Sequence, residues 1–167
     1  TRELAFLNKG LRIILMDDRT GESDTFVYEG GIKEFVAYVN KNKTPIHEDI
    51  VYVEGMENDI SIEVALQYND GYNATVYSFV NNITPEGGTH EDGVKLALTR
   101  IINNYAKANK ILKDNDEPLS GDDVREGITM IISAKVPEPQ FEGQTKNKLG
   151  NSEVRKVAAS IFAKAFD

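Results

Sequence analysis

The sequence predicts a single α+β domain in which a mixed β-sheet carries its helices on one face. Apolar residues alternate with the two-residue period of half-buried strands over 60–68 and 128–136. They recur every three or four residues over 32–39, 91–112 and 154–165, which is the period of amphipathic helices. Strand-like and helix-like segments interleave along 167 residues without a repeat or a linker, as in an α+β domain.

Two polar turns predict hairpins. The first joins LRIILMD (11–17) to TFVYEGG (25–31) through a stretch rich in charged and turn residues. The second joins 60–68 to NATVYSFV (73–80) through NDGY, where Gly71 could adopt a positive φ. The alternating strand 60–68 is therefore expected to pair directly with 73–80.

Three segments have the spacing of helices with one apolar face. The first ends before Pro45, and its apolar face is Ile32, Phe35, Val36 and Val39. The longest is 91–112, with a stripe formed by Val94, Leu98, Ile101, Ile102 and Tyr105. The last begins at a cap residue, Asn151 or Ser152, and its stripe is Val154, Val157, Ala158, Ile161, Phe162 and Ala165.

A short helical turn is expected in SGDDVREG, where Ser120 and Asp123 have the spacing of a capping box. A metal pair formed by Asp122, Asp123 and Glu126 is the alternative, and capping with ion pairing is favoured over it. The strand 128–136 follows this turn and ends at two prolines.

Composition excludes several classes of site. The chain has no cysteine, which excludes disulfides and cysteine metal sites, and its two histidines, His47 and His90, are far apart. We assign His90 a structural role, capping the long helix or holding a loop by a hydrogen bond. A net charge of −8 argues against a domain that coats nucleic acid. No apolar run is long enough to span a bilayer, so no membrane partner is expected. The absence of cysteine suits a reducing cytosol, and we expect a cytoplasmic protein.

Several segments together resemble the transducer domain in the ATPase subunit of bacterial type IIA topoisomerases, that is, of gyrase B or its topoisomerase IV counterpart. The segments are YEGGIKEFVAYVNKNKTPIH, IEVALQYNDGY, SFVNNITPEGGTHEDG, GDDVREG and QFEGQTKNKLGNSEVR. The resemblance implies a left-handed βαβ crossover, an exception to the usual handedness. It also implies that 1–167 is one transducer domain, a fragment of a longer subunit whose preceding GHKL ATP-binding domain is absent here.

By this resemblance, Gln144 and Lys146 in QTKNKLGN reach the γ-phosphate of ATP, and Lys146 acts in catalysis. A lysine ammonium offsets the charge that develops on phosphate oxygens, and a glutamine amide donates a neutral hydrogen bond. The alternative is a solvated polar loop. Lys148 is expected only to orient the loop or to face solvent. Mg²⁺ would be bound by the absent domain, so no metal site and no ATPase activity are expected of this chain alone.

The implied function is to couple ATP binding and hydrolysis to closure of a dimeric clamp and to DNA strand passage or supercoiling. The implied partners are the ATP-binding domain of the same subunit, a second copy of that subunit, the DNA-cleaving subunit (gyrase A or its topoisomerase IV equivalent) and duplex DNA. Lys95 and Arg100 would face a DNA cavity or simply lie on an exposed helix face. The alternatives are a non-catalytic protein-interaction module and the related domain of a mismatch-repair ATPase.

Overall fold

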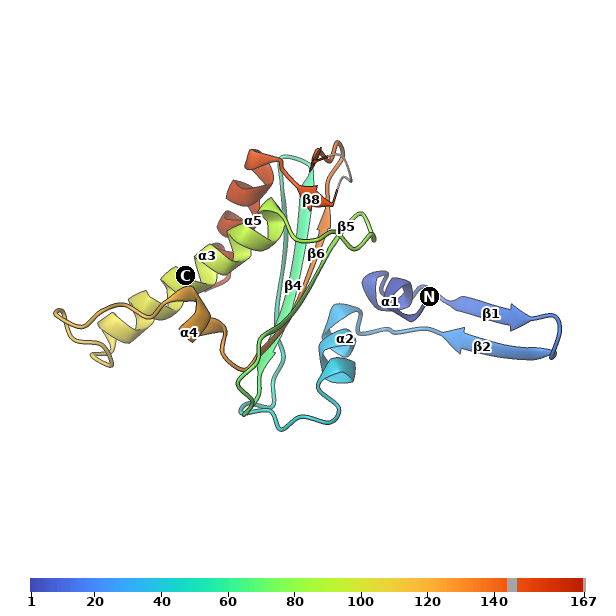
Figure 1. Ribbon diagram of the computed structural model, residues 1–167, viewed down its shortest axis with the longest axis horizontal. Helices are drawn as coiled ribbons and strands as arrows, with labels where there is room; N and C mark the ends of the chain where they lie inside the picture. The colour runs from blue at the N-terminus through green and yellow to red at the C-terminus, as the bar shows by residue number, and fades with distance from the viewer. Residues whose placement is uncertain (144–146, 167) are drawn as a thin grey trace.

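A computed structural model describes residues 1–143 and 147–166 of the chain (Figure 1). Its elements, in chain order, are α1 (Arg2–Leu7), β1 (Ile13–Asp17), β2 (Glu22–Phe26), α2 (Ile32–Val39), β3 (Val51–Glu57), β4 (Ile60–Tyr68), β5 (Thr75–Val80), α3 (Thr89–Ala108), α4 (Gly121–Arg125), β6 (Ile128–Lys135), β7 (Phe141–Glu142), β8 (Lys148–Leu149) and α5 (Ser152–Lys164). The predicted α+β class is confirmed. Helix α1 and the strands β3, β7 and β8 were not predicted.

The central sheet is mixed and has the strand order β3-β4-β6-β5. Strand β6 pairs antiparallel with β4, placing Val64 opposite Ile132, and parallel with β5. Because β5 and β6 are parallel neighbours, α3 and α4 form the crossover that connects them, which makes a βαβ unit. Strand β6 is buried at every position from Ile128 to Ala134, as expected for the centre of a sheet covered on both faces.

The predicted hairpin between 60–68 and 73–80 is wrong. Strand β4 instead forms its hairpin with β3, through Asn58 and Asp59, which both have positive φ (53° and 63°). Two left-handed residues match the twist of a two-residue hairpin, and Asn and Asp tolerate that conformation well. The edge of β4 that β5 was expected to occupy is taken by β6, which is buried at every position from Ile128 to Ala134 and lies at the centre of the sheet.

The larger core lies between the sheet and the helices α3 and α5. Side chains from alternate positions of β4 and β6, such as Ile62 and Met130, pack there against Val94 and Phe162. The two helices approach closely at Gly93, where an added Cβ would lie 2.4 Å from the carbonyl oxygen of Arg155. The predicted helices 91–112 and 154–165 therefore share one face of the sheet. Tyr105 is an exception to the predicted stripe of α3, since 63% of it is exposed.

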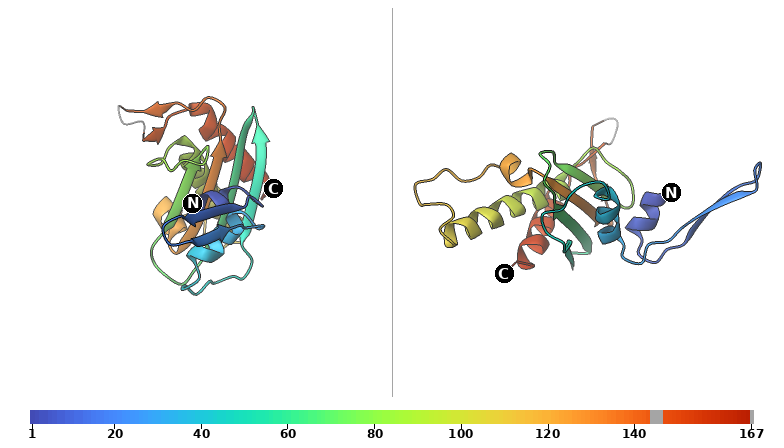
Figure 2. Two further views of the ribbon diagram at one scale, coloured as in Figure 1. Left: turned by 90° about the vertical axis from the view of Figure 1, so that its right-hand side faces the viewer. Right: turned by 90° about the horizontal axis from the view of Figure 1, so that it is seen from below.

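The opposite face carries a smaller core under α2 and α1, so helices do not lie on one face alone. Phe6, Phe35 and Val36 pack there against Ile131 and Phe79. Figure 2 shows the sheet between this pair of short helices and the longer pair α3 and α5. Helices cover both faces because β6 carries Ile131 on the face opposite to Met130 and Ile132, and burying apolar side chains on both faces is favourable.

The hairpin of β1 and β2 extends away from the sheet (Figure 1). Its second strand begins earlier than predicted, at Glu22, and Ile13 pairs with Phe26. Met16 is 70% exposed, and Ile14 and Leu15 are about half exposed. The capping box of α4 is confirmed, since Ser120 accepts from the Asp123 amide and Asp123 accepts from the Ser120 amide.

Candidate functional site

The segment that carries the predicted phosphate contacts is enclosed by the small hairpin of β7 and β8. Phe141 pairs with Leu149 and Glu142 with Lys148. The hairpin lies at one end of the central sheet, close to where α5 begins (Figure 1). Gln144 and Lys146, the predicted contacts of the γ-phosphate, lie outside the described residues. Lys148 is exposed on β8, and the minor role expected of it stays a prediction.

The C-terminal stem of this hairpin, residues 147–149, is hydrogen-bonded to the turn that precedes α3. Leu149 forms a parallel bridge with Gly88, and its amide donates to the Gly87 carbonyl at 3.3 Å. The Glu86 amide donates to the Asn147 carbonyl at 2.5 Å. Gly88 has a φ of 147°, and a Cβ there would lie 2.6 Å from the Cβ of Leu149, so no larger residue fits. The glycines of GGTH thus serve a close backbone approach as well as a turn.

The N-terminal stem, residues 138–142, is held by Asn151. This residue lies at the N-cap position of α5 and is one of the two predicted cap residues. Its side chain makes no capping hydrogen bond to the helix. Instead, its Oδ1 accepts from the Gln140 amide at 2.7 Å, and its Nδ2 donates to the Glu138 carbonyl at 3.2 Å. The Gly150 amide closes the stem by donating to the Gln140 carbonyl at 2.7 Å. Both stems are therefore fixed to the starts of α3 and α5.

His90, in the first turn of α3, is fully buried. Neither ring nitrogen has a hydrogen-bond partner among the residues that the structure describes, so the expected capping or loop-holding bond is not found there. Burial lowers the pKa of His90 to about 4, although the nearby Glu91 and Asp92 act in the opposite direction. The ring is neutral near pH 7 and acts as a core side chain.

Lys95 and Arg100 lie on α3, away from the hairpin stems. The Lys95 ammonium pairs with Glu91 at 2.5 Å, and Glu91 also accepts from the Ser78 hydroxyl at 2.8 Å. Burial acts to raise the pKa of Glu91, but the hydrogen bonds from Lys95 and Ser78 lower it below its ordinary value. Much of the Lys95 charge is thus already compensated within the chain. Arg100 is exposed.

Two of the three acidic residues around α4, Asp122 and Asp123, are engaged as predicted. Asp123 belongs to the capping box, and Asp122 pairs with Arg125 at 3.2 Å. Across residues 1–143 and 147–166, no group of three histidine, cysteine, aspartate or glutamate residues could hold a metal ion. Within the same ranges, no helix has the length and apolarity needed to cross a membrane.

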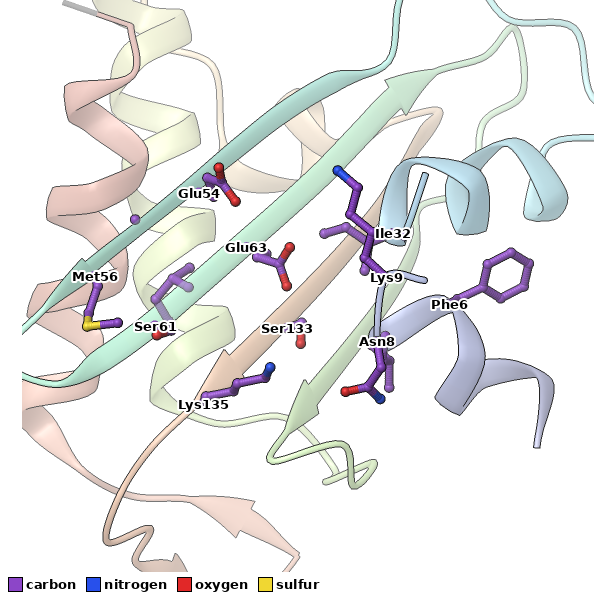
Figure 3. Close-up of a pocket in the computed structure, with 14 residues that line it drawn as sticks. Phe6, Asn8, Lys9, Ile32, Glu54, Met56, Ser61, Glu63, Ser133 and Lys135 are labelled. Atoms are coloured by element: carbon purple, nitrogen blue, oxygen red, sulfur yellow. The ribbon is translucent and has the colours of Figure 1, made fainter. Parts of the chain in front are cut away.

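A pocket of about 750 Å³ lies on the sheet face beside α1 and α2 (Figure 3). Its wall combines apolar side chains with charged and polar ones, which include Glu54, Glu63, Ser133 and two lysines, Lys9 and Lys135. The hydroxyl of Tyr52 lies 2.9 Å from Glu54 and 2.5 Å from Glu63. Burial and these two carboxylates raise the pKa of Tyr52. This pocket was not predicted from the sequence, because β3, which supplies Glu54 and Met56 to its wall, was not predicted.

Comparison with known proteins decides the family. The family model for DNA gyrase B matches residues 31–167. The chain belongs to the DNA gyrase B family. It is 57% identical to a DNA gyrase B protein of Bacillus mycoides over 168 residues, and 57% identical to that of Clostridium acetobutylicum over 164 residues. The predicted resemblance is confirmed.

Solved structures give the same fold. The chain superposes on the 43K ATPase domain of Thermus thermophilus gyrase B, in complex with an aminocoumarin, with a TM-score of 0.86 and 31% identity over 99% of its length. A topoisomerase IV ATP-binding domain of Francisella tularensis, 24% identical with a TM-score of 0.81, shares the fold.

This DNA gyrase B family chain spans only part of its relatives. It covers 42% of the Bacillus mycoides protein, 26% of the Clostridium acetobutylicum protein and 45% of the Thermus thermophilus chain. The match to the family model begins at residue 31, so α1, β1 and β2 precede it. Of the residues that fix the hairpin stems, the sequence indicated Asn151 only as a cap and Gly87 and Gly88 only as turn residues. Little in the sequence indicated that Asn151 holds the hairpin, because an asparagine before a helix ordinarily indicates capping.

Proposed function

We propose that this chain is the transducer part of an ATP-dependent type II DNA topoisomerase. Gln144 and Lys146 contact the γ-phosphate of ATP bound in another domain of the same subunit. The chain couples ATP binding and hydrolysis to closure of a dimeric clamp, and so to strand passage or supercoiling. Membership of the DNA gyrase B family supports this assignment, and it removes the reason to prefer a mismatch-repair ATPase.

The anchored hairpin of β7 and β8 is the observation that carries the proposal. Its stems are bonded to the turn before α3 and to Asn151, the N-cap residue of α5. Since α3 and α5 pack on each other at Gly93, a displacement of the stems is transmitted to both long helices. A phosphate contact made between these stems can therefore bias the orientation of the whole domain. A lysine and a glutamine there lose their partner when the γ-phosphate leaves, which gives a switch.

The exposed hairpin of β1 and β2 supports a further domain of the same subunit as a partner. Two strands alone are marginally stable in water, and Leu15 and Met16 are left exposed. We assign this surface to the ATP-binding domain, which also binds Mg²⁺. The other partners are a second copy of the subunit, the DNA-cleaving subunit and duplex DNA, in the cytoplasm. Arg100 on α3 is the side chain better placed for DNA, since Lys95 is paired with Glu91.

The test uses the full-length subunit reconstituted with its DNA-cleaving partner. Lys146→Ala is expected to lower kcat for ATP by about 10²–10³, because one electrostatic contact with the transferred phosphoryl group is lost. Lys148→Ala is the matched control, since it removes an exposed lysine two residues away and should change kcat little. Gln144→Ala should fall between them.

Supercoiling by the same variants should fall in the same order as hydrolysis. Thermal unfolding of each variant separates lost chemistry from lost folding. If Lys146→Ala hydrolysed ATP at the wild-type rate, the loop would be an ordinary solvated loop and the proposed γ-phosphate contact would be wrong. Introduction of negative supercoils, as against relaxation and decatenation alone, distinguishes gyrase from topoisomerase IV.

A further inference from the structure

The segment that leads from β6 to β7 has an unusual hydrogen-bond arrangement. Pro137 and Pro139 have no amide hydrogen, so this stretch cannot join a sheet ladder as a regular strand. Two asparagine side chains bond its main chain instead. Asn81 accepts from the Val136 amide and donates to the Val136 carbonyl, both at 2.9 Å. Asn151 accepts from the Gln140 amide at 2.7 Å and donates to the Glu138 carbonyl at 3.2 Å.

These bonds make residues 136–140 a rigid arm. Both prolines fix φ, and the residues between and beside them are held by an amide side chain. Asn81 is itself held in the left-handed region, with a φ of 49°, and its amide donates to the Ala134 carbonyl at 2.8 Å. Asparagine suits this task because one planar group presents both a donor and an acceptor to a peptide main chain.

Asn151 is the more informative of the two. Only 3% of it is exposed, and it occupies the N-cap position without capping α5. Its Nδ2 also donates to Glu153 at 2.8 Å, which fixes the orientation of the amide. The side chain that would ordinarily stabilise a helix start is used here to hold the stem of the neighbouring hairpin.

We propose that Asn151 is a positioning residue for phosphate chemistry, and that Asn81 assists it by fixing the start of the arm. Together they set the direction in which the chain leaves the sheet before residues 144–146. The inference rests on the proposed role of Lys146 at the γ-phosphate. Neither asparagine touches the nucleotide; each acts through the arm. Because a misplacement of about 1 Å far from the chemistry can cost about 10²-fold in rate, the arm is a sensitive element.

The test compares variants of the full-length subunit in steady-state ATP hydrolysis. Asn151→Ala should lower kcat by about 10-fold or more while KM for ATP changes by less than about twofold, because binding energy from the rest of the nucleotide is kept. Asn151→Asp keeps the acceptor for the Gln140 amide but turns the donor into a carboxylate oxygen that faces the Glu138 carbonyl and the Glu153 carboxylate, so it should lower kcat as well. If Asn151→Ala does not fold, Asn151→Asp still tests the positioning role. A wild-type kcat for Asn151→Asp would overturn the proposal.

The chain contains a matched control. Asn103 clamps Leu119 in the same way, accepting from its amide at 2.8 Å and donating to its carbonyl at 3.0 Å, toward the other end of α3. Asn103→Ala removes the same kind of bonds away from the hairpin and should leave kcat within about twofold of wild type. An equal loss of kcat in Asn103→Ala and Asn151→Ala would show general destabilisation and would refute a positioning role.

A double-mutant cycle separates this inference from the proposed function. If Asn151 acts through Lys146, Asn151→Ala should cost no further activity in a Lys146→Ala background, measured in single turnovers. Loss of the same factor in both backgrounds would refute the positioning role while leaving the role of Lys146 intact. A wild-type rate for Lys146→Ala alone would instead refute the proposed function.

Discussion

Gly93 sets the distance between the two long helices, and its replacement by alanine tests that description of the core. An added Cβ would lie 2.4 Å from the Arg155 carbonyl oxygen and 3.1 Å from the Cβ of Ala158. The first contact is with main chain, which cannot rotate away, so α3 and α5 must separate. Overpacking of this kind costs about 1–3 kcal/mol.

Because the 2.4 Å contact is with main chain, the cost lies near the upper end, about 3 kcal/mol; the intrinsic preference for alanine in a helix returns up to about 1 kcal/mol, which leaves a net loss of about 2 kcal/mol. For a domain of this size, Tm should fall by roughly 2–4 °C per kcal/mol, which is readily measured by circular dichroism. Gly121→Ala is the control, because the nearest atoms to its added Cβ belong to the flexible end of the Arg125 side chain. If Gly93→Ala were as stable as wild type, the close helix approach would not limit packing.

Two further predictions concern His90 and the isolated chain. Burial lowers the pKa of His90 to about 4 from an ordinary 6.5, so the unfolded chain binds a proton at this residue more readily than the folded chain. The neutral ring therefore contributes up to about 3 kcal/mol to the free energy of unfolding. This contribution is fully present above pH 6.5 and is lost as the pH falls toward 4. Chemical denaturation of wild type and His90→Leu across that range should show a steeper pH dependence for wild type, and equal slopes would contradict a buried neutral ring. The chain alone should show no ATP hydrolysis above a Lys146→Ala control, since the proposed nucleotide site lies mostly in another domain; robust turnover by the pure chain would contradict this.

Local patterns predicted the helices well. The stripes at Ile32, Phe35 and Val36, and at Val154, Val157 and Phe162, are buried as expected, because helical periodicity depends on neighbours in sequence. The capping box at Ser120 was predicted for the same reason. Each of these features is determined within a few residues.

Strand pairing was not predictable in this way. A turn-like NDGY suggested that β4 pairs with β5, but the edge of β4 is occupied by β6, which arrives much later in the chain. Strand β3 was missed because Gly55 interrupts its alternation. That glycine has a tertiary cause: a Cβ there would lie 2.8 Å from the Cγ2 of Ile161 on α5. No local pattern reveals such a contact.

In the candidate site, too, some features follow from the local sequence and others depend on tertiary contacts. The sequence placed Gln144 and Lys146 in a loop before α5 by resemblance, and their contact with phosphate stays a prediction. Asn151 was interpreted as a cap because that is what its position usually means. Its use as a clamp on Glu138 and Gln140 depends on how the segment 136–140 lies beside the start of α5, which the local sequence does not specify.

The central place of β6 has a consequence for synthesis of the protein on the ribosome. Tyr68 at the end of β4 pairs with Ile128, roughly 60 residues later. At about 5–20 residues per second, β3 and β4 must wait roughly 3–12 s for that partner to be made. During this interval one edge of β4 has no paired strand, and an unpaired strand edge can pair with a strand of another chain and so cause aggregation. The nascent chain is thus most exposed to aggregation while α3 is being translated, and slowing translation across that helix should lower the soluble yield.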